Sequence, residues 1–353
     1  MVLVFALAAV LWGVGAAMKT PRRARWLMIG ILYVLVLAVQ IALPPDHPVR
    51  LATGESPAFW LILGGFAGLV VAYRFGLRRL RARAQDRETA AQPPAQAGAF
   101  TDTELNRYAR HIVLREIGGP GQKALREARV LVVGAGGLGA PVLQYLAAAG
   151  VGTIGVIDDD VVENANLQRQ VIHTDARIGT PKVFSAQTAM QAQNPFVTVR
   201  PYHRRLTPDI ADTLIADYDI VIDGTDNFDT RYLVNAAAVR AGVPLISGAL
   251  TQWEGQLSVF DPARNAPCYR CIFDKAPAPE LAPSCAEAGV AGPLPGVVGS
   301  MMAIEAIKLI TGAGAPLRGQ MAIYDALYGE NRTITLARRA DCPDCGTAPM
   351  AGG

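Results

Sequence analysis

The chain has little charge, few histidines and few cysteines, and each shortage excludes a class of function. Only 18% of its 353 residues are charged and the net charge is +3, which gives no support to nucleic-acid binding. It contains four histidines, none of which stands in a plausible nucleophile–histidine–acid triad. A hydrolase built on such a triad is therefore not expected.

The cysteines that are present form a pattern that predicts a metal site. Cys268 and Cys271 make one Cys-x-x-Cys pair, and Cys342 and Cys345 make a second pair much later in the chain. Two such pairs supply four thiolates, the ligand set of structural zinc. A pair of disulfides is the alternative, which is disfavoured because thiols stay reduced in the cytosol. We expect a structural zinc ion that joins distant segments.

Long apolar runs occur at the N-terminal end and predict a membrane anchor. They cover residues 1–18, 26–43 and about 58–77, each near the length of a membrane span. Basic residues follow the first and third runs, whereas the loop after the second run holds two acids and one arginine. The positive-inside rule then places Met1 outside and everything after residue 78 in the cytoplasm. A cleaved signal peptide is disfavoured because the first run lacks a basic start.

Downstream of the anchor, strands and helices alternate. Such alternation predicts a Rossmann-like, doubly wound α/β fold with a mostly parallel sheet and right-handed crossovers. Later segments alternate apolar and polar residues, which indicates an antiparallel C-terminal section, and the apolar helix at 296–311 is expected to be buried. The parallel strands are expected at 129–133, 153–158, 197–202, 219–224 and 244–249, and the antiparallel strands at 256–261, 320–326 and 332–338.

A glycine-rich turn directly follows the first expected strand. Gly134, Gly136 and Gly139 form G-x-G-x-x-G at the start of a helix, where phosphate is favoured. Asp158 ends the next strand, the position of an acid that binds ribose hydroxyls. These features alone do not distinguish this chain from an NAD-dependent enzyme.

Further polar residues follow that are not typical of a dehydrogenase. One group lies in a loop, one residue begins a helix, and one group lies past the C-terminal end of a strand, where ligands of open α/β sheets bind. Basic side chains and an acid that converge on one nucleotide suit a triphosphate with magnesium. These residues are Asn166, Gln168 and Arg169 in the loop, Lys182 at the helix start, and Asp226 and Asn227 after the strand.

The motifs together resemble the ubiquitin-activating-enzyme-like superfamily (HesA/MoeB/ThiF family), and most of all its molybdopterin-synthase adenylyltransferases. The resemblance covers residues 100–346 and leaves out the anchor. The matching segments are RYARHI (107–112), GAGGLGAPVLQYLAAAGVGTIGVIDDD (134–160), NLQRQVIH (166–173), GTPKV (179–183), DGTDN (223–227), PCYRC (267–271), CAEAGV (285–290) and CPDC (342–345).

The resemblance implies a role for each matching residue. It places Gly137 and the preceding turn against the ATP phosphates, Asp158 on the ribose, and Asp226 at the magnesium ion beside the α-phosphate. Arg110 would be donated across the interface of a homodimer. Cys285, the fifth cysteine, is used in some relatives for a thioester or sulfur-transfer step, and its role here is left open. The expected triphosphate ligands are Asn166, Gln168, Arg169 and Lys182, with Asn227 in the same loop as Asp226.

The resemblance also implies a reaction. A ubiquitin-like sulfur carrier would be adenylylated by ATP at its C-terminal Gly-Gly carboxylate, with release of pyrophosphate. The carrier of molybdopterin synthase, its small subunit, is favoured, and the thiamine carrier is the alternative. Since no sulfurtransferase domain follows residue 346, a separate sulfur donor is expected. From other classes, an NAD-dependent oxidoreductase and a non-catalytic membrane scaffold remain open.

The expected organisation has four parts. Residues 1–83 form the anchor with three transmembrane helices, and residues 84–99 form a flexible linker rich in Pro, Ala and Gln. Residues 100–346 form the adenylyltransferase domain, and residues 347–353 form a tail. We therefore expect a multi-pass protein of the cytoplasmic membrane whose catalytic domain lies in the cytoplasm.

Overall fold

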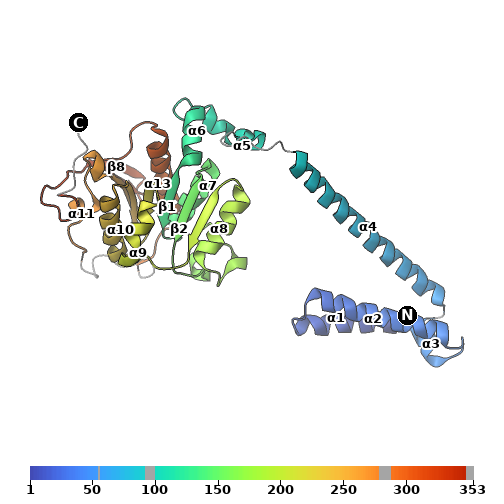
Figure 1. Cartoon of the computed structure of the whole chain (residues 1–353). Coiled ribbons are helices and arrows are strands. Elements are labelled where there is room, and N and C mark those ends of the chain that lie inside the picture. Colours follow the sequence, from blue (N-terminus) through green and yellow to red (C-terminus); the bar gives the residue numbers. More distant parts are fainter. Residues whose placement is uncertain (55, 92–99, 278–287, 347–353) are drawn as a thin grey trace. The chain divides into compact units, whose positions relative to one another are not determined.

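The computed structural model describes residues 1–54, 56–91, 100–277 and 288–346 (Figure 1). The chain divides into two compact units, Met1–Ala99 and Phe100–Gly353.

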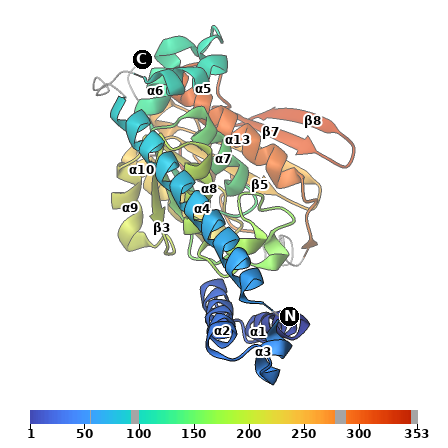
Figure 2. The same ribbon diagram turned by 90° about the vertical axis from the view of Figure 1, so that its right-hand side faces the viewer.

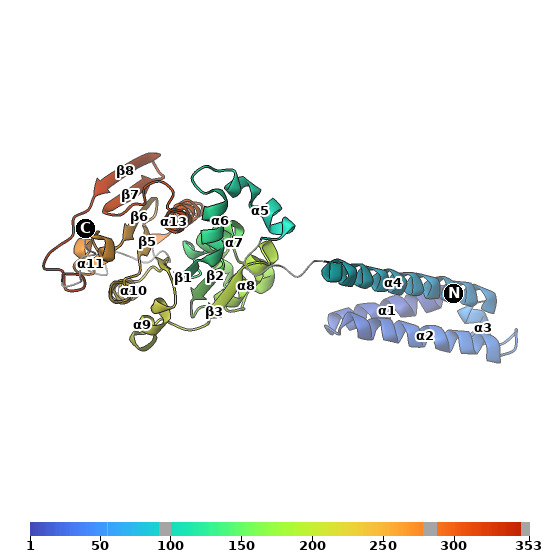
Figure 3. The same cartoon turned by 45° about the horizontal axis from the view of Figure 1, so that its top comes forward.

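The first unit is helical. Figure 3 shows α1 and α2 side by side, and a small apolar cluster of Val4, Val36 and Trp60 joins α1, α2 and α4. Most of the large apolar side chains of this unit point outward, with Val2 84% and Ile62 73% exposed. Apolar surface of this extent is not stable in water. The helices are α1 (Val2–Ala17), α2 (Arg22–Ala42), α3 (Pro48–Thr53) and α4 (Pro57–Ala91).

Two helices of this unit are long and apolar enough to cross a membrane. They are α2 and the Pro57–Leu77 part of α4, with 21 residues each. The run at 1–18 forms α1, whose 16 residues extend about 24 Å and fall short of a bilayer core of about 30 Å. In the second unit, α13 (Leu294–Thr311) also has the length and composition of a span, but it packs into the core there.

The expected linker is partly helical. Helix α4 continues through Ala91, so residues 84–91 belong to it, and residues 92–99 lie outside the described part. The segment AQDRETAA consists mostly of strong helix formers, and the next proline comes only at Pro93. Composition alone therefore mistook the end of a helix for a linker.

The second unit is built on a mixed eight-stranded sheet with the order β3-β2-β1-β4-β5-β6-β7-β8. The first five strands are parallel and the last three are antiparallel, as the sequence predicts, and Figure 2 shows β7 and β8 at one edge. The strands are β1 (Arg129–Val133), β2 (Thr153–Ile157), β3 (Thr198–Tyr202), β4 (Ile220–Asp223), β5 (Leu245–Leu250), β6 (Glu254–Phe260), β7 (Gln320–Asp325) and β8 (Glu330–Thr335).

Helices cover both faces of this sheet. On β1, Val130 and Val132 face a core shared with α7, α8 and α13, whereas Leu131 and Val133 face a core shared with α9 and α10. Successive side chains of a strand point to opposite faces of the sheet, so a strand that is covered on both faces contributes to an apolar core on each side. The helices are α5 (Asp102–Ile112), α6 (Gly118–Glu127), α7 (Gly139–Ala149), α8 (Lys182–Gln193), α9 (Pro208–Ala216), α10 (Phe228–Ala241), α11 (Tyr269–Ile272) and α13.

The register of the parallel strands brings the predicted motifs together. Val133 at the end of β1 lies beside Ile157 of β2 and Asp223 of β4. The loops that follow these three strands therefore leave the sheet at the same edge. The glycine-rich turn, Asp158 and the GTDN loop meet there.

Candidate functional site

One large cavity opens at the carboxyl ends of the parallel strands. Its volume is about 1640 Å³, more than the roughly 300–1,000 Å³ of a pocket for one drug-sized ligand. Two sets of residues line it. The nucleotide wall consists of the lining residues of the glycine-rich turn, of the segment from Asp158 to Lys182 and of the GTDN loop. The second wall consists of the lining residues of segments 249–256 and 269–275, together with Asp325 and Leu327.

The glycine-rich turn has the geometry that its glycines require. Gly134 has φ +93°, in the left-handed region that favours glycine. A Cβ on Gly139 would lie 1.9 Å from the backbone oxygen of Gly134, so this glycine allows α7 to start against β1. Gly134, Gly136 and Gly137 line the cavity, whereas Gly139 is buried behind them.

Asp158 lines the cavity and also stabilises the turn. Its carboxylate accepts hydrogen bonds from the N–H of Ala135 at 2.7 Å and from the N–H of Asp160 at 2.8 Å. His173 supports the same turn from behind, with Nε2 3.0 Å from the Ala135 oxygen and Nδ1 2.9 Å from Ser185 Oγ. Burial lowers the pKa of His173, and both ring nitrogens are occupied, so this histidine is a structural residue.

Lys182 has a partner that the sequence analysis did not assign. Its side chain is only 6% exposed, and Nζ lies 2.6 Å from Oδ2 of Asp160. A buried ammonium needs a counter-ion, and Asp160 supplies one from the rim of the cavity. The sequence signal that could have identified this partner is the run of three acids at 158–160, which directly follows β2.

The loop after β2 places Asn166, Arg169 and Gln170 on the cavity. Asn166 and Arg169 line the cavity, and Arg169 donates to the Ala165 oxygen at 3.2 Å. Gln168 is exposed, lies next to Gly292 and is absent from the described lining, and its role as a triphosphate ligand stays a prediction. Gln170 lines the cavity instead. It is 4% exposed, and its Oε1 has no hydrogen-bond partner in the described part of the chain.

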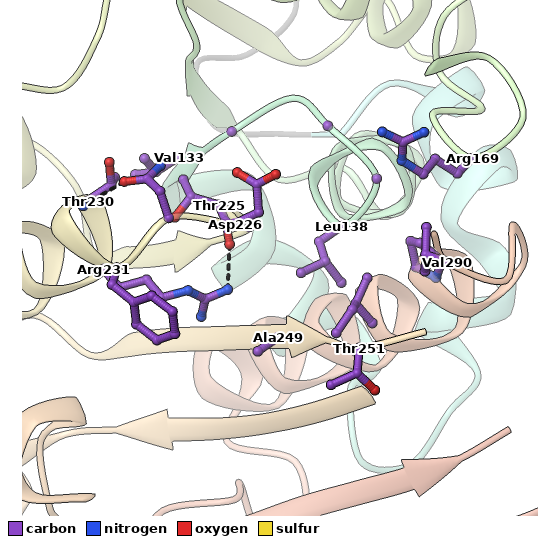
Figure 4. A pocket seen from close by; sticks show the side chains of 18 of the residues that line it. Val133, Leu138, Arg169, Thr225, Asp226, Thr230, Arg231, Ala249, Thr251 and Val290 are labelled. Carbon is purple, nitrogen blue, oxygen red and sulfur yellow. Dashed lines mark hydrogen bonds between the residues drawn. The ribbon is translucent and has the colours of Figure 1, made fainter. Parts of the chain in front are cut away.

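The GTDN loop presents Asp226 to the cavity, and Figure 4 shows it between Thr225 and the glycine-rich turn. Asn227 also lines the cavity, but its side-chain oxygen caps α10 by accepting from the Thr230 N–H at 2.9 Å. Arg231 and Asp223 are buried behind this loop, and the sequence analysis missed both. The sequence signal that could have identified this pair is a carboxylate at the end of a buried strand, Asp223, with an arginine eight residues later, Arg231.

Two predicted residues are not among the described residues that line this cavity. Arg110 is exposed on α5 and does not belong to the lining in the part of the chain that the structure describes. Cys285 lies outside the described residues.

The four paired cysteines form one buried cluster. Their Sγ atoms lie 3.8 Å apart for Cys268–Cys271, 3.5 Å for Cys268–Cys342 and 3.4 Å for Cys271–Cys345. Four thiolates about 2.3 Å from a tetrahedral ion are about 3.8 Å apart, whereas disulfide sulfurs are about 2.0 Å apart. Burial raises the pKa of Cys268, and it raises the pKa of Cys345 to about 11. The cluster fits a zinc ion and excludes the disulfide alternative for these residues.

The cluster is connected to the cavity through α10. Asn235 accepts from the N–H of Tyr269 at 2.8 Å and donates to Asp344 at 2.7 Å. Tyr232 donates to the Phe273 oxygen at 2.9 Å. Both Cys-x-x-Cys segments are thereby attached to the helix that begins at the GTDN loop.

A doubly wound sheet with a glycine-rich turn of the phosphate-binding type, cationic and acidic groups on one cavity, and a four-cysteine cluster together define an α/β protein of the nucleotide-binding class, with a cluster that could hold a metal ion. The chain belongs to the ThiF family, whose model matches residues 108–345.

Curated relatives agree with this assignment. The chain is 52% identical over 254 residues to the sulfur carrier protein adenylyltransferase of Thermus thermophilus, which covers 71% of this chain and 94% of that protein. It is 48% identical to the SAMP-activating enzyme E1 of Haloferax volcanii, over 69% of this chain and 90% of that protein. It is 47% identical to the adenylyltransferase and sulfurtransferase MOCS3 of Bos taurus, but spans only 58% of that protein.

Among solved structures, the fold resembles that of E. coli MccB with ATP, with a TM-score of 0.61, 25% identity, and coverage of 68% of this chain and 74% of that chain. The family and the identity of about one half to named adenylyltransferases make this chain an adenylyltransferase. The oxidoreductase alternative is therefore wrong.

Proposed function

We propose that the protein uses ATP to adenylylate the C-terminal Gly-Gly carboxylate of a ubiquitin-like sulfur carrier. The small subunit of molybdopterin synthase is the favoured carrier, and the thiamine-pathway carrier is the alternative. The observation that carries the proposal is one large cavity in which the nucleotide wall faces a second wall, with a volume that leaves room for another substrate. The names of the relatives agree with a sulfur carrier as that substrate.

The chemistry needs positioning and charge. A terminal carboxylate is already ionised at neutral pH and is itself the nucleophile toward the α-phosphorus of ATP, so no general base is required. Arg169 and Lys182 disperse the negative charge that develops on the phosphoryl oxygens and on the leaving pyrophosphate. Asp226 would hold magnesium, which neutralises phosphate charge when it is bound. Asp158 would hold the ribose.

We propose that the active enzyme is a homodimer and that Arg110 acts in the partner's site. Arg110 is exposed on α5 and away from the cavity of its own chain, and α5 is followed by the exposed apolar residues Val113 and Leu114. A mixture of Arg110→Ala and Asp226→Ala chains then contains dimers with one intact site. Recovered activity in the mixture supports the shared site, and no recovery contradicts it.

We propose that the first unit anchors the enzyme in the cytoplasmic membrane and that the second unit lies in the cytoplasm. The support is the outward-facing apolar surface of α2 and of the first part of α4, with the basic residues that follow it. Carbonate extraction of membranes from expressing cells tests the anchor. Release of the full chain into the soluble fraction would contradict it.

The central experiment is ATP–pyrophosphate exchange by the detergent-solubilised full chain. The molybdopterin-synthase small subunit and the thiamine carrier are tested in parallel, with Asp226→Asn as the inactive control. Exchange with one carrier identifies the pathway. Exchange with neither, in folded protein that contains zinc and binds ATP, would overturn the sulfur-carrier assignment and favour a scaffold or another substrate. The separate sulfur donor and the covalent role of Cys285 both concern the later transfer of sulfur. Cys285→Ala tests the covalent role, and undiminished sulfur transfer by this variant would contradict it.

A further inference from the structure

A buried guanidinium joins the two walls of the cavity. Arg231 lies near the start of α10, and its side chain is 6% exposed. It donates to the backbone oxygen of Thr225 in the GTDN loop, to the backbone oxygen of Gly248 on β5 at 2.9 Å, and to Ser247 Oγ at 3.3 Å. Figure 4 shows the bond to the Thr225 oxygen directly beside Asp226.

Asp223 completes this arrangement from the end of β4. Its carboxylate is buried and accepts from the Thr225 N–H at 3.0 Å, from Thr225 Oγ1 at 2.6 Å and from Ser247 Oγ at 3.2 Å. Arg231 lies 3.7 Å from it and balances its charge. Thr225 is thus held at its N–H, its hydroxyl and its carbonyl group, immediately before Asp226. We call Arg231, Asp223 and Ser247 the clamp.

Arg231 lines the cavity, and its contacts indicate that it positions other groups there. Its guanidinium donates to three protein oxygens and faces a buried carboxylate. Among these partners, Thr225 belongs to the GTDN loop of the nucleotide wall. Ser247 and Gly248 belong to β5 and directly precede Ala249 of the second wall. One terminal nitrogen, Nη2, donates to both backbone oxygens, while the other, Nη1, donates to Ser247 Oγ and lies 3.7 Å from Asp223. An ammonium group has a single nitrogen for all of these partners, so lysine does not reproduce this set of contacts.

We propose that Arg231 is a positioning residue that sets the spacing between the nucleotide wall and the second wall. This inference rests on the proposed function, in which the α-phosphorus lies against one wall and the attacking carboxylate against the other. In such a transfer, a misplacement of about 1 Å costs about 100-fold in rate. The clamp therefore acts on the chemical step more than on the binding of ATP.

The test is Arg231→Lys in the full chain, with the carrier protein that supports wild-type exchange. We expect kcat to fall about 100-fold, while the KM for ATP and the Kd of MgATP measured by calorimetry change less than about threefold. The matched control is Arg240→Lys on the same helix, since Arg240 pairs with Asp212 on the surface. Its kcat is expected to stay within about twofold of wild type.

Each outcome decides the inference. An unchanged kcat in Arg231→Lys overturns it, and so does a fall in kcat matched by an equal rise in the Kd of MgATP. Should Arg231→Lys not fold, Ser247→Ala removes one acceptor and leaves the guanidinium, and kcat should then fall about tenfold at constant KM. An unchanged kcat in that variant also overturns the inference. Absence of exchange by the wild-type chain overturns the proposed function and this inference together.

Discussion

Replacement of Asp160 by asparagine removes the counter-ion of a buried lysine, and the structure predicts opposite effects on stability and on ATP binding. Lys182 is 6% exposed, whereas Asp160 is 66% exposed, and the atoms that pair are 2.6 Å apart. Loss of one partner of a fully buried pair costs about 3–5 kcal/mol. Because Asp160 is open to water, we expect a smaller loss of about 1–2 kcal/mol in the ATP-free protein.

The triphosphate of ATP would supply the negative charge that the variant lacks. If Lys182 leaves Asp160 for the phosphates, the ATP-bound wild type and variant have similar stabilities. By linkage, Asp160→Asn should then bind ATP about 5–30-fold more tightly than wild type, since 1.4 kcal/mol is a factor of ten. The assay is urea unfolding followed by circular dichroism without ATP, together with calorimetric titration of ATP.

A matched control distinguishes the effect of burying the ion pair from the effect of its short N–O distance. Asp212 and Arg240 are also 2.6 Å apart, but both are more than half exposed. Asp212→Asn should therefore change stability by less than about 1 kcal/mol and leave ATP affinity unaltered. Weaker ATP binding by Asp160→Asn would refute the reasoning, because Asp160 would then serve Lys182 or magnesium in the ATP complex as well.

Three further predictions follow from the fold. Cys342→Ser should lower the zinc content, measured by atomic absorption, from about one ion per chain to less than half, and lower the Tm, because three thiolates do not close the site; an unchanged zinc content would contradict the assigned ligands. His173 is neutral in the fold and its pKa is lowered, so the unfolded chain binds the extra proton and stability falls as the pH drops below about 6.5; His173→Gln should flatten the Tm–pH curve between about pH 6.5 and 5, and an unaltered slope would count against this. Gly139→Ala places a Cβ 1.9 Å from a backbone oxygen and should destabilise by more than about 2 kcal/mol in urea unfolding, whereas Gly119→Ala meets open space and should be tolerated.

Local sequence patterns predicted much of the secondary structure of the second unit. The β1 strand, the turn at Gly134 and the starts of α7 and α8 were predictable because apolar periodicity, glycine and proline act within a few residues of the chain. The paired cysteines were predictable for another reason. Their spacing is a ligand pattern, so the cluster could be assigned even though its two halves come from distant segments.

Sequence patterns predicted the structure less well in loops, which have no regular apolar periodicity, and at the ends of helices. Gln168 and Gln170 stand in a loop without regular periodicity, and only the folded chain decides which of them is buried. The end of α4 was misjudged because helix ends depend on weak preferences of single residues.

The sequence by itself determined the class of fold, the glycine-rich turn, the four clustered cysteines and the family, because these depend on residue type at short or fixed spacing. Only the tertiary structure decided that Asp160 neutralises Lys182 and that Arg231 joins the GTDN loop to β5. The physical reason is that a buried charge selects its partner by proximity in three dimensions. For Arg231 that proximity is set by the register of β4 and β5, and for Lys182 by the bridge between Val161 and Pro181, neither of which a local pattern in the chain encodes.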